Sequence, residues 1–129
     1  MASIFTKIIN GEIPSYKIHE DELTYTFLNI NPIQLGHLLI VPKQEVDHII
    51  DADDESYLQV YKNAKIIGKA LQKVTSCKRI GYAVQGFEVP HFHLHLIPML
   101  SPEDFLFERQ KPADNKDLGN ICEKIIEAL

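Results

Sequence analysis

The segment His91-Phe92-His93-Leu94-His95-Leu96-Ile97-Pro98 alternates imidazole and apolar side chains over its first six residues. Side chains of a β-strand point alternately to its two faces, so the three histidines share one face and the three apolar side chains share the other. In an α-helix the same three rings would be spread over about 400° of rotation. The pattern therefore predicts a strand with one core face and one face of histidines.

Further strands are predicted on the N-terminal side of this segment. Apolar and β-branched residues favour strands at residues 24–30 and 36–41. Residues 31–36 contain Asn, Pro and Gly, and are suited to the turn that joins these two strands. Residues 80–85 favour a strand that precedes the one at 92–98. Hairpin-linked strands of this kind indicate an antiparallel sheet.

Two helices are predicted from apolar spacings of three and four residues. The first covers residues 54–74 and begins where acidic residues gather, as helix N-termini favour. The second is an amphipathic helix at the end of the chain, capped by Asp114 or Asn115. Segregated strands and helices indicate an α+β fold. The buried face of the first helix is expected to contain Leu58, Tyr61, Ala64, Gly68 and Leu71.

The composition restricts the class of protein. The 129 residues are 45% hydrophobic and 24% charged, which fits one globular domain over residues 1–129. A net charge of −5 disfavours binding to nucleic-acid polymers, and no apolar stretch is long enough for a membrane span. No signal-peptide pattern is present, and the two cysteines form no metal motif. We therefore expect free thiols and a cytoplasmic location.

The histidine face has three explanations. It can be a strand face in contact with solvent, although accident rarely places three of six histidines at alternate positions. It can bind a metal, since histidines on a strand are able to ligate zinc. It can also serve acid–base or nucleophilic chemistry on an anion, because imidazole titrates near neutral pH. No nearby cysteine, His-Glu-x-x-His motif or acidic cluster supports the metal, so the last explanation is favoured.

A longer pattern is also present. Residues 91–97 match, at every position, the motif His-φ-His-φ-His-φ-φ, in which φ is apolar. Through this motif the sequence resembles the histidine triad (HIT) family, in its nucleotide-binding hydrolase branch. The resemblance covers about residues 3–100, whereas residues 101–129, a C-terminal tail and helix, carry no signature of the family. The other segments that resemble the family are its opening residues 3–14 and the nucleotide-binding hairpin at 27–32 and 36–43.

This resemblance implies both a fold and an activity. The implied fold is a five-stranded antiparallel sheet with two helices, paired in a homodimer. The implied activity is hydrolysis of nucleoside 5′-phosphoramidates or related nucleotidyl conjugates through a covalent nucleotidyl-histidine intermediate, with a purine nucleotide substrate and no cofactor. Alternatives are dinucleoside polyphosphate hydrolysis, nucleotidyl transfer, nucleotide binding with weak catalysis, and metal-dependent hydrolysis on the histidine strand.

Four histidines receive roles from the resemblance. His93 is implied to be the nucleophile that attacks phosphorus, and the carbonyl of His91 to fix its tautomer. His95 is implied to contact the phosphate and help protonate the leaving group. His37 and His91 are implied to complete the polar cluster around the phosphoryl group. The residues implied to bind the nucleotide are Ile4, Phe5, Phe27, Leu28, Asn29, Ile30, Phe87, Glu88 and Val89.

Three of these nucleotide-binding positions differ from the family's pattern. Asn29 stands where an Asp commonly contacts the ribose hydroxyls, so a charge-assisted bond is lost there. Phe87 stands where a Gln commonly reaches the phosphate or leaving group. Glu88 would repel a phosphate unless its side chain turns away. We expect altered recognition of ribose and of the leaving group.

The resemblance also bears on metal binding. Many bacterial relatives hold a structural zinc ion through two cysteines in the opening segment and a later histidine. The corresponding positions in this sequence are Ser3, Thr6 and Glu45. Hydroxyl groups do not ligate zinc as thiolates do. We therefore expect no metal at this position, which leaves His91 free for the active site.

Overall fold

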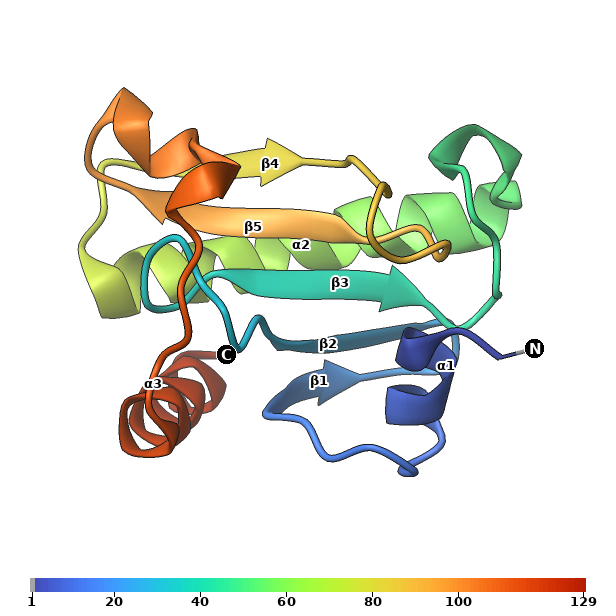
Figure 1. Cartoon of the computed structure of the whole chain (residues 1–129), viewed down its shortest axis with the longest axis horizontal. Coiled ribbons are helices and arrows are strands. Elements are labelled where there is room, and N and C mark those ends of the chain that lie inside the picture. The colour runs from blue at the N-terminus through green and yellow to red at the C-terminus, as the bar shows by residue number, and fades with distance from the viewer. Residues whose placement is uncertain (1) are drawn as a thin grey trace.

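Five antiparallel strands form one sheet in the computed structural model, which describes residues 2–129 (Figure 1). The order along the sheet is β1-β2-β3-β5-β4, so β1 and β4 are its edges. The expected α+β fold with a five-stranded antiparallel sheet is confirmed, although the residue pattern alone predicts four of the strands and not β1. The strands are β1 (Lys17–Glu20), β2 (Thr24–Leu28), β3 (Leu38–Pro42), β4 (Arg79–Ala83) and β5 (Leu94–Met99).

The hairpin that joins β2 and β3 is formed as predicted, with Leu28 paired to Leu38 across it. Gly36 ends the turn with a φ of 104°, in the region that residues with side chains avoid. A Cβ at this position would also lie 3.0 Å from Cδ1 of Leu71. The turn therefore requires glycine, and it sets the position of His37, the next residue.

Helices lie on both sides of the sheet. Both predicted helices are confirmed, and the side chain of Asp114, one of the two expected caps, accepts a hydrogen bond from the N–H of Asp117 at 2.8 Å. A short N-terminal helix was not predicted, because six residues are too few to show a period. Among residues 2–129, each helix is too short or too polar to span a bilayer. The helices are α1 (Ile4–Ile9), α2 (Asp54–Thr75) and α3 (Asn115–Ala128), with 3₁₀ helices η1 (Ile49–Asp51), η2 (Pro102–Phe105) and η3 (Phe107–Arg109).

One face of α2 is buried, but it is not the whole of the predicted face. Leu58 is 64% exposed, so its prediction as a core residue is wrong. It lies two residues, or about 200° around the helix, from Val60, which is fully buried. Tyr61 lies at the margin of the core. The buried stripe passes through Val60, Ala64, Ile67, Gly68 and Leu71.

The sheet is covered on both faces, with α2 on one and α1 on the other (Figure 1). Adjacent residues of β3 point to opposite sides: Leu38 and Ile40 pack in the core under α2, whereas Leu39 and Val41 pack with Phe5 of α1. Helix α3 packs against α2 and β1. The face under α1 is the smaller apolar cluster, and it borders the histidines.

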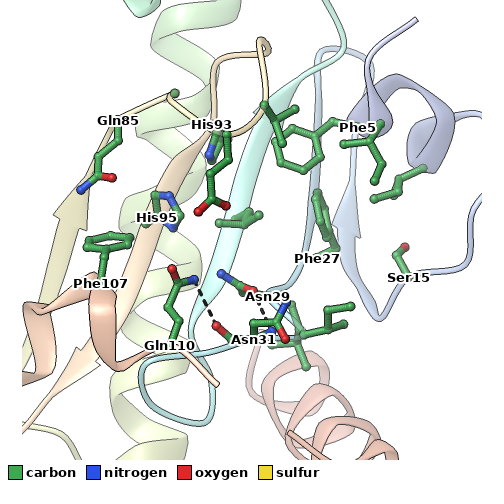
Figure 2. A pocket seen from close by; sticks show the side chains of 18 of the residues that line it. Phe5, Ser15, Phe27, Asn29, Asn31, Gln85, His93, His95, Phe107 and Gln110 are labelled. Carbon is green, nitrogen blue, oxygen red and sulfur yellow. Dashed lines mark hydrogen bonds between the residues drawn. The ribbon is translucent and has the colours of Figure 1, made fainter. Parts of the chain in front are cut away.

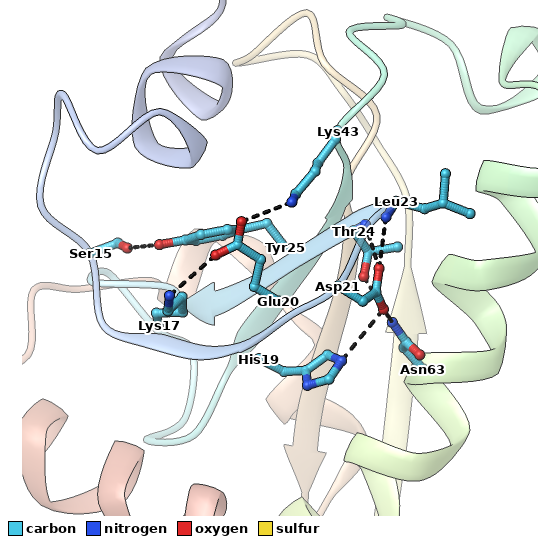
Figure 3. A network of polar contacts seen from close by, with 10 residues as sticks. All are labelled: Ser15, Lys17, His19, Glu20, Asp21, Leu23, Thr24, Tyr25, Lys43 and Asn63. Atoms are coloured by element: carbon cyan, nitrogen blue, oxygen red, sulfur yellow. Dashed lines mark hydrogen bonds and ion pairs between the residues drawn. The ribbon is translucent and has the colours of Figure 1, made fainter.

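Two acidic residues hold the β1–β2 hairpin in place (Figure 3). A carboxylate oxygen of Asp21 accepts a hydrogen bond from the backbone N–H of Thr24 at 2.7 Å, and its other oxygen accepts one from Nδ2 of Asn63 in α2 at 2.6 Å. The carboxylate of Glu20 lies 2.8 Å from Nζ of Lys43, which follows β3. These contacts fix β2, the strand that leads into the site, against α2 and β3.

Candidate active site

The predicted histidine face is formed and is buried. Phe92, Leu94 and Leu96 pack in the core under α2. His91, His93 and His95 lie on the opposite side, and each of the three is at most 6% exposed. This burial excludes the explanation that they form a solvent-facing strand surface. His37 is also fully buried and joins them.

A hydrogen bond joins His37 to His95. The backbone N–H of Ile33 donates to Nδ1 of His37 at 3.1 Å, so this nitrogen is unprotonated and the His37 proton resides on Nε2. Nε2 of His37 lies 2.9 Å from Nδ1 of His95 and donates to it. The remaining proton of a neutral His95 therefore resides on its Nε2. The hydrogen-bond partners thus assign both tautomers.

His93 has the opposite tautomer. Its Nδ1 lies 2.7 Å from the backbone carbonyl of His91, which can only accept, so Nδ1 carries the proton. Nε2 of His93 then holds a free lone pair. The rings of His93 and His95 have centroids 5.0 Å apart, which places an unprotonated nitrogen and a protonated one on neighbouring side chains.

Burial keeps these rings neutral. Desolvation, together with repulsion from a charged His93, lowers the pKa of His37 to about 4. Desolvation, with repulsion from His37 and His93, lowers the pKa of His95 to about 3. Desolvation also lowers the pKa of His93, although the bond to the His91 carbonyl and the charge of Glu88 act in the opposite direction. At pH 7 the three rings are uncharged.

The ring of His91 lies outside the cavity described below and ties the site to α1. Its Nε2 donates to the carbonyl of Pro42 at 2.8 Å, so its Nδ1 accepts from the hydroxyl of Ser3 at 2.6 Å. The backbone N–H of Ser3 and the hydroxyl of Thr6 both donate to Oε1 of Glu45, each at 2.6 Å. The three residues that the resemblance relates to a zinc site therefore lie together beside His91, joined by hydrogen bonds.

The part of the chain that the structure describes contains no group of side chains suited to hold a metal ion. Within residues 2–129, no set of three or more His, Cys, Asp and Glu side chains is arranged to hold a metal ion. The four histidines use ring nitrogens in hydrogen bonds to one another, to Ser3 or to backbone groups. Both ring nitrogens of His37 and both of His91 are engaged in these bonds, so neither residue could ligate a metal without losing one of them.

A cavity of about 550 Å³ lies beside His93 and His95 (Figure 2). Neither His37 nor His91 lines it, so these two residues lie behind the pair that does. The rings of Phe5 and Phe27 form an apolar end, with centroids 5.5 Å apart. The structure brings all nine sequence-predicted nucleotide-binding residues to the cavity wall: Ile4, Phe5, Phe27, Leu28, Asn29, Ile30, Phe87, Glu88 and Val89.

One wall of the cavity was missed in the sequence. The ring of Phe107 packs edge-on against His95, with centroids 4.9 Å apart, and Nε2 of Gln110 donates to the carbonyl of Asn31 at 3.1 Å. The wall is held by the buried Asp104, which accepts hydrogen bonds from Gln34 and from the backbone N–H of Leu100 and Ser101. Only the Ser-Pro at residues 101–102 signals a short helix there, and it does not indicate where the helix packs. The additional lining residues are Ile8, Ile13, Pro14, Ser15, Asn31, Leu39, Gln85, Gly86, Phe107, Glu108 and Gln110.

Asn29 reaches the cavity with its amide partly engaged. Its Oδ1 accepts a hydrogen bond from the backbone N–H of Asn31 at 2.9 Å (Figure 2). Because an N–H needs an acceptor, this bond also fixes which end of the amide is oxygen. The NH₂ group is then the end of Asn29 that remains to donate to a ligand.

Comparisons with known proteins agree with this geometry. A family model described as HIT domain matches residues 10–101. The chain is 40% identical over 132 residues to adenosine 5′-monophosphoramidase HNT1 of Saccharomyces cerevisiae, covering 99% of this chain and 83% of that one. A HIT-like protein of Bartonella henselae, described as involved in cell-cycle regulation, has a crystal structure that matches with a TM-score of 0.87 at 30% identity, covering 98% and 96% of the two chains. Since the matched model spans most of its length, the chain belongs to the HIT domain family.

Proposed function

We propose that this protein is a nucleotide hydrolase that cleaves nucleoside 5′-phosphoramidates and related nucleotidyl conjugates through a covalent intermediate on His93. One observation carries the proposal: the unprotonated Nε2 of His93 and the protonated Nε2 of His95 belong to neighbouring rings at one cavity. A nucleophile next to a hydrogen-bond donor suits displacement at phosphorus. Similarity to the yeast adenosine 5′-monophosphoramidase supports the same reaction class.

In the first step, the lone pair on Nε2 of His93 attacks the α-phosphorus of the conjugate. A bond forms between this nitrogen and phosphorus, and the bond from phosphorus to the leaving nitrogen breaks. The ring is neutral when it attacks, so no proton has to leave it first. The hydrogen bond from Nδ1 to the carbonyl of His91 stabilises the positive charge that develops on the ring.

The leaving nitrogen takes up one proton as the amine departs. The Nε2–H of His95 donates a hydrogen bond to the reacting group. The proton that the leaving nitrogen takes up comes from solvent and enters the site together with the substrate. Water then attacks phosphorus, the bond between phosphorus and His93 breaks, and the nucleoside monophosphate leaves. This second step returns one proton to solvent and restores neutral His93.

The nucleoside occupies the opposite end of the cavity. The apolar end of the cavity, where the rings of Phe5 and Phe27 pack edge-on and Ile4 and Ile30 also line the wall, is suited to a purine base. Asn29 follows β2 directly and lines the same cavity. In the proposed orientation its NH₂ group, the end of the amide not engaged with Asn31, donates to a ribose oxygen. A nucleotide in this orientation presents its phosphorus to His93.

The proposal is tested with metal-free protein and two substrates, adenosine 5′-phosphoramidate and a diadenosine polyphosphate. Release of AMP from the phosphoramidate is expected, and His93→Ala should lower the rate by about 10⁴–10⁶ while still binding AMP. Equal rates for wild type and His93→Ala would indicate a protein that binds nucleotides with weak or no catalysis. Activity that requires added zinc or manganese would favour metal-dependent hydrolysis instead. Mass spectrometry of acid-free quenched protein should detect the nucleotidyl group on the peptide that contains His93.

We also propose that two copies pair through the open edge of β4. Within residues 2–129, β4 pairs only with β5. Tyr82 on this edge is 43% exposed and forms an aromatic row with Tyr61 and Tyr57 of α2, with ring centroids 6.2 and 5.2 Å apart. An open edge with exposed aromatic rings is a surface that a second copy can cover. Light scattering should give twice the chain mass for wild type and for Ile126→Glu, and a monomer for Tyr82→Glu.

Residues 1–129 are proposed to act as one domain in the cytoplasm. The core under α2 includes Leu118 and Ile125 of α3, so the C-terminal segment packs with the rest of the chain. Cys77 and Cys122 are buried free thiols, a state that a reducing compartment preserves. Cell fractionation tests the location, and a single cooperative unfolding transition tests the domain.

A further inference from the structure

The cavity beside His93 and His95 contains negative charge and no positive charge. Among its lining residues, Glu88 and Glu108 are the only charged side chains, and neither Lys nor Arg is present. The two lining histidines are neutral at pH 7 because they are buried. A cavity with only negative charge is unusual for a site that is proposed to bind a phosphoryl group. These charges restrict which substrates can bind there.

Neither carboxylate forms an ion pair with any other residue in the described range 2–129. The ion pairs formed within residues 2–129 involve other acidic residues, and both glutamates are exposed toward solvent and the cavity. Neither side chain has a hydrogen-bond partner among the contacts of the described residues. Their charges therefore remain available to a ligand.

Both glutamates belong to the half of the cavity that contains the reacting histidines. The charge of Glu88 acts on His93, where it favours the protonated ring. Glu108 directly follows Phe107, whose ring packs against His95 at 4.9 Å. Phe107 and His95 lie on one side in Figure 2, and Phe5 and Phe27 lie on the other. In the proposed orientation, with the base at the apolar end formed by Phe5 and Phe27, the leaving group extends toward the glutamates.

Two phenylalanines share this half of the cavity. Phe87 is 94% exposed and precedes Glu88, and Phe107 precedes Glu108. An exposed aromatic face attracts a cation through its ring electrons. Each carboxylate thus belongs to a residue next in sequence to a phenylalanine that also lines the cavity, and both kinds of group favour positive charge. A polyphosphate leaving group would instead bring several negative charges toward the two carboxylates.

We propose that Glu88 and Glu108, with Phe87 and Phe107, select substrates whose leaving group is an amine that also carries a positively charged ammonium group. The inference rests on the proposed function and names its substrate class. It assigns the protein to nucleotidyl conjugates of diamines or of peptides with a basic side chain, rather than to dinucleoside polyphosphates.

Three adenosine 5′-phosphoramidates of similar size test the inference: the conjugates of ethylenediamine, propylamine and glycine, whose leaving groups are cationic, neutral and anionic. We expect kcat/KM to fall in that order for wild type. The ratio between the first two conjugates is then compared between wild type, Glu88→Gln, Glu108→Gln and the double variant. This comparison cancels differences in the intrinsic reactivity of the amines. Assays at pH 8 keep His93 neutral with or without Glu88.

The expected result is that each single substitution lowers the ratio and that the double variant lowers it by about tenfold. Glu123→Gln, an exposed position on α3, is the matched control and should leave the ratio unchanged. Added salt should also reduce the wild-type ratio, because it screens the carboxylates.

Two failures are distinguishable. If wild type cleaves the conjugates in a His93-dependent way but the double variant keeps the wild-type ratio, the charge selection is wrong and the proposed function stands. If none of the conjugates is cleaved although AMP binds, the proposed function fails, and the inference fails with it.

Discussion

Nε2 of His37 lies 2.9 Å from Nδ1 of His95, in a hydrogen bond between two buried imidazoles. The direction of this bond is set by a second hydrogen bond, in which the backbone N–H of Ile33 donates to Nδ1 of His37 and so leaves the His37 proton on Nε2. The sequence of donors from Ile33 through His37 to His95 keeps the His95 proton on Nε2, the nitrogen available to the cavity. The turn before β3 therefore controls which nitrogen of His95 can donate to a ligand.

Replacing His37 by Phe should lower kcat by about 10–100-fold and leave KM nearly unchanged. Phe keeps a ring in the buried space but cannot donate to Nδ1 of His95, so His95 is free to place its proton on the wrong nitrogen. Steady-state kinetics on adenosine 5′-phosphoramidate measures the effect. His37→Gln retains an N–H donor and an acceptor for Ile33, and should recover part of the loss. A folded His37→Phe protein with wild-type kcat would show that the pair has no part in the reaction.

The buried histidines should make the fold less stable in mild acid. In the unfolded chain a histidine has a pKa near 6.5, whereas in the fold the pKa of His37 is about 4 and that of His95 about 3. The unfolded state therefore binds protons first as the pH falls, and the stability present above pH 6.5 declines toward pH 4. Each histidine contributes at most about 2 kcal/mol between pH 6.5 and 5.

Urea unfolding at pH 7 and pH 5 measures this decline. His95→Gln should show a smaller difference between the two pH values than wild type, since one buried group no longer titrates. His48 is exposed, with 72% of its side chain accessible, and His48→Gln should keep the wild-type difference. Identical free energies of unfolding at both pH values in wild type would contradict the neutral, buried pair.

Much of the site could be predicted because its residues lie in or next to strands. Alternation predicted that His93 and His95 share one face, a position that depends on local periodicity and that a single sequence displays. Phe27 and Asn29, which also line the cavity, were assigned to the site by the resemblance to the family and not by periodicity. Periodicity predicted the buried face of α2 less well, because Leu58 is an apolar residue on a face that solvent reaches.

Two of the elements that residue spacing did not indicate, helix α1 and the wall that carries Phe107, each depend on a polar side chain with distant partners. Helix α1 has only six residues, and Ser3 both caps it and bonds to His91, 88 residues away. The wall that carries Phe107 depends on Asp104, which bonds to Gln34 across 70 residues. Contacts between residues so far apart leave no periodic signal, so neither could be deduced from residue spacing.

Ser3→Ala should destabilise the protein by about 1–2 kcal/mol. The substitution removes the oxygen that accepts from the N–H of Thr6 at 3.1 Å, and leaves Nδ1 of His91 buried without its donor. Thermal and urea unfolding measure the loss. AMP binding should weaken as well, because α1 carries Ile4 and Phe5 of the cavity wall. Ser3→Thr retains the hydroxyl and should be close to wild type; an equal loss in both variants would assign the effect to packing instead.

Asn29→Asp should increase discrimination between ribonucleotide and deoxyribonucleotide. One carboxylate oxygen can still accept from the N–H of Asn31, as Oδ1 of Asn29 does now, while the second is free to accept from ribose hydroxyls. A charge-assisted bond is stronger than the neutral one by about 1 kcal/mol, or about fivefold in affinity. The ratio of the Kd values for dAMP and AMP, measured by calorimetry, should rise by that factor.

Using a ratio removes a competing effect of the new charge. A third carboxylate in a cavity that already contains Glu88 and Glu108 repels the phosphate, and this weakens AMP and dAMP equally because both carry the same phosphate. Asn31→Asp adds the same charge to the same cavity wall, away from the position proposed for ribose, and should weaken both ligands without changing their ratio. If Asn29→Asp also leaves the ratio at its wild-type value, the ribose does not contact Asn29 and the nucleoside lies in the cavity in another orientation.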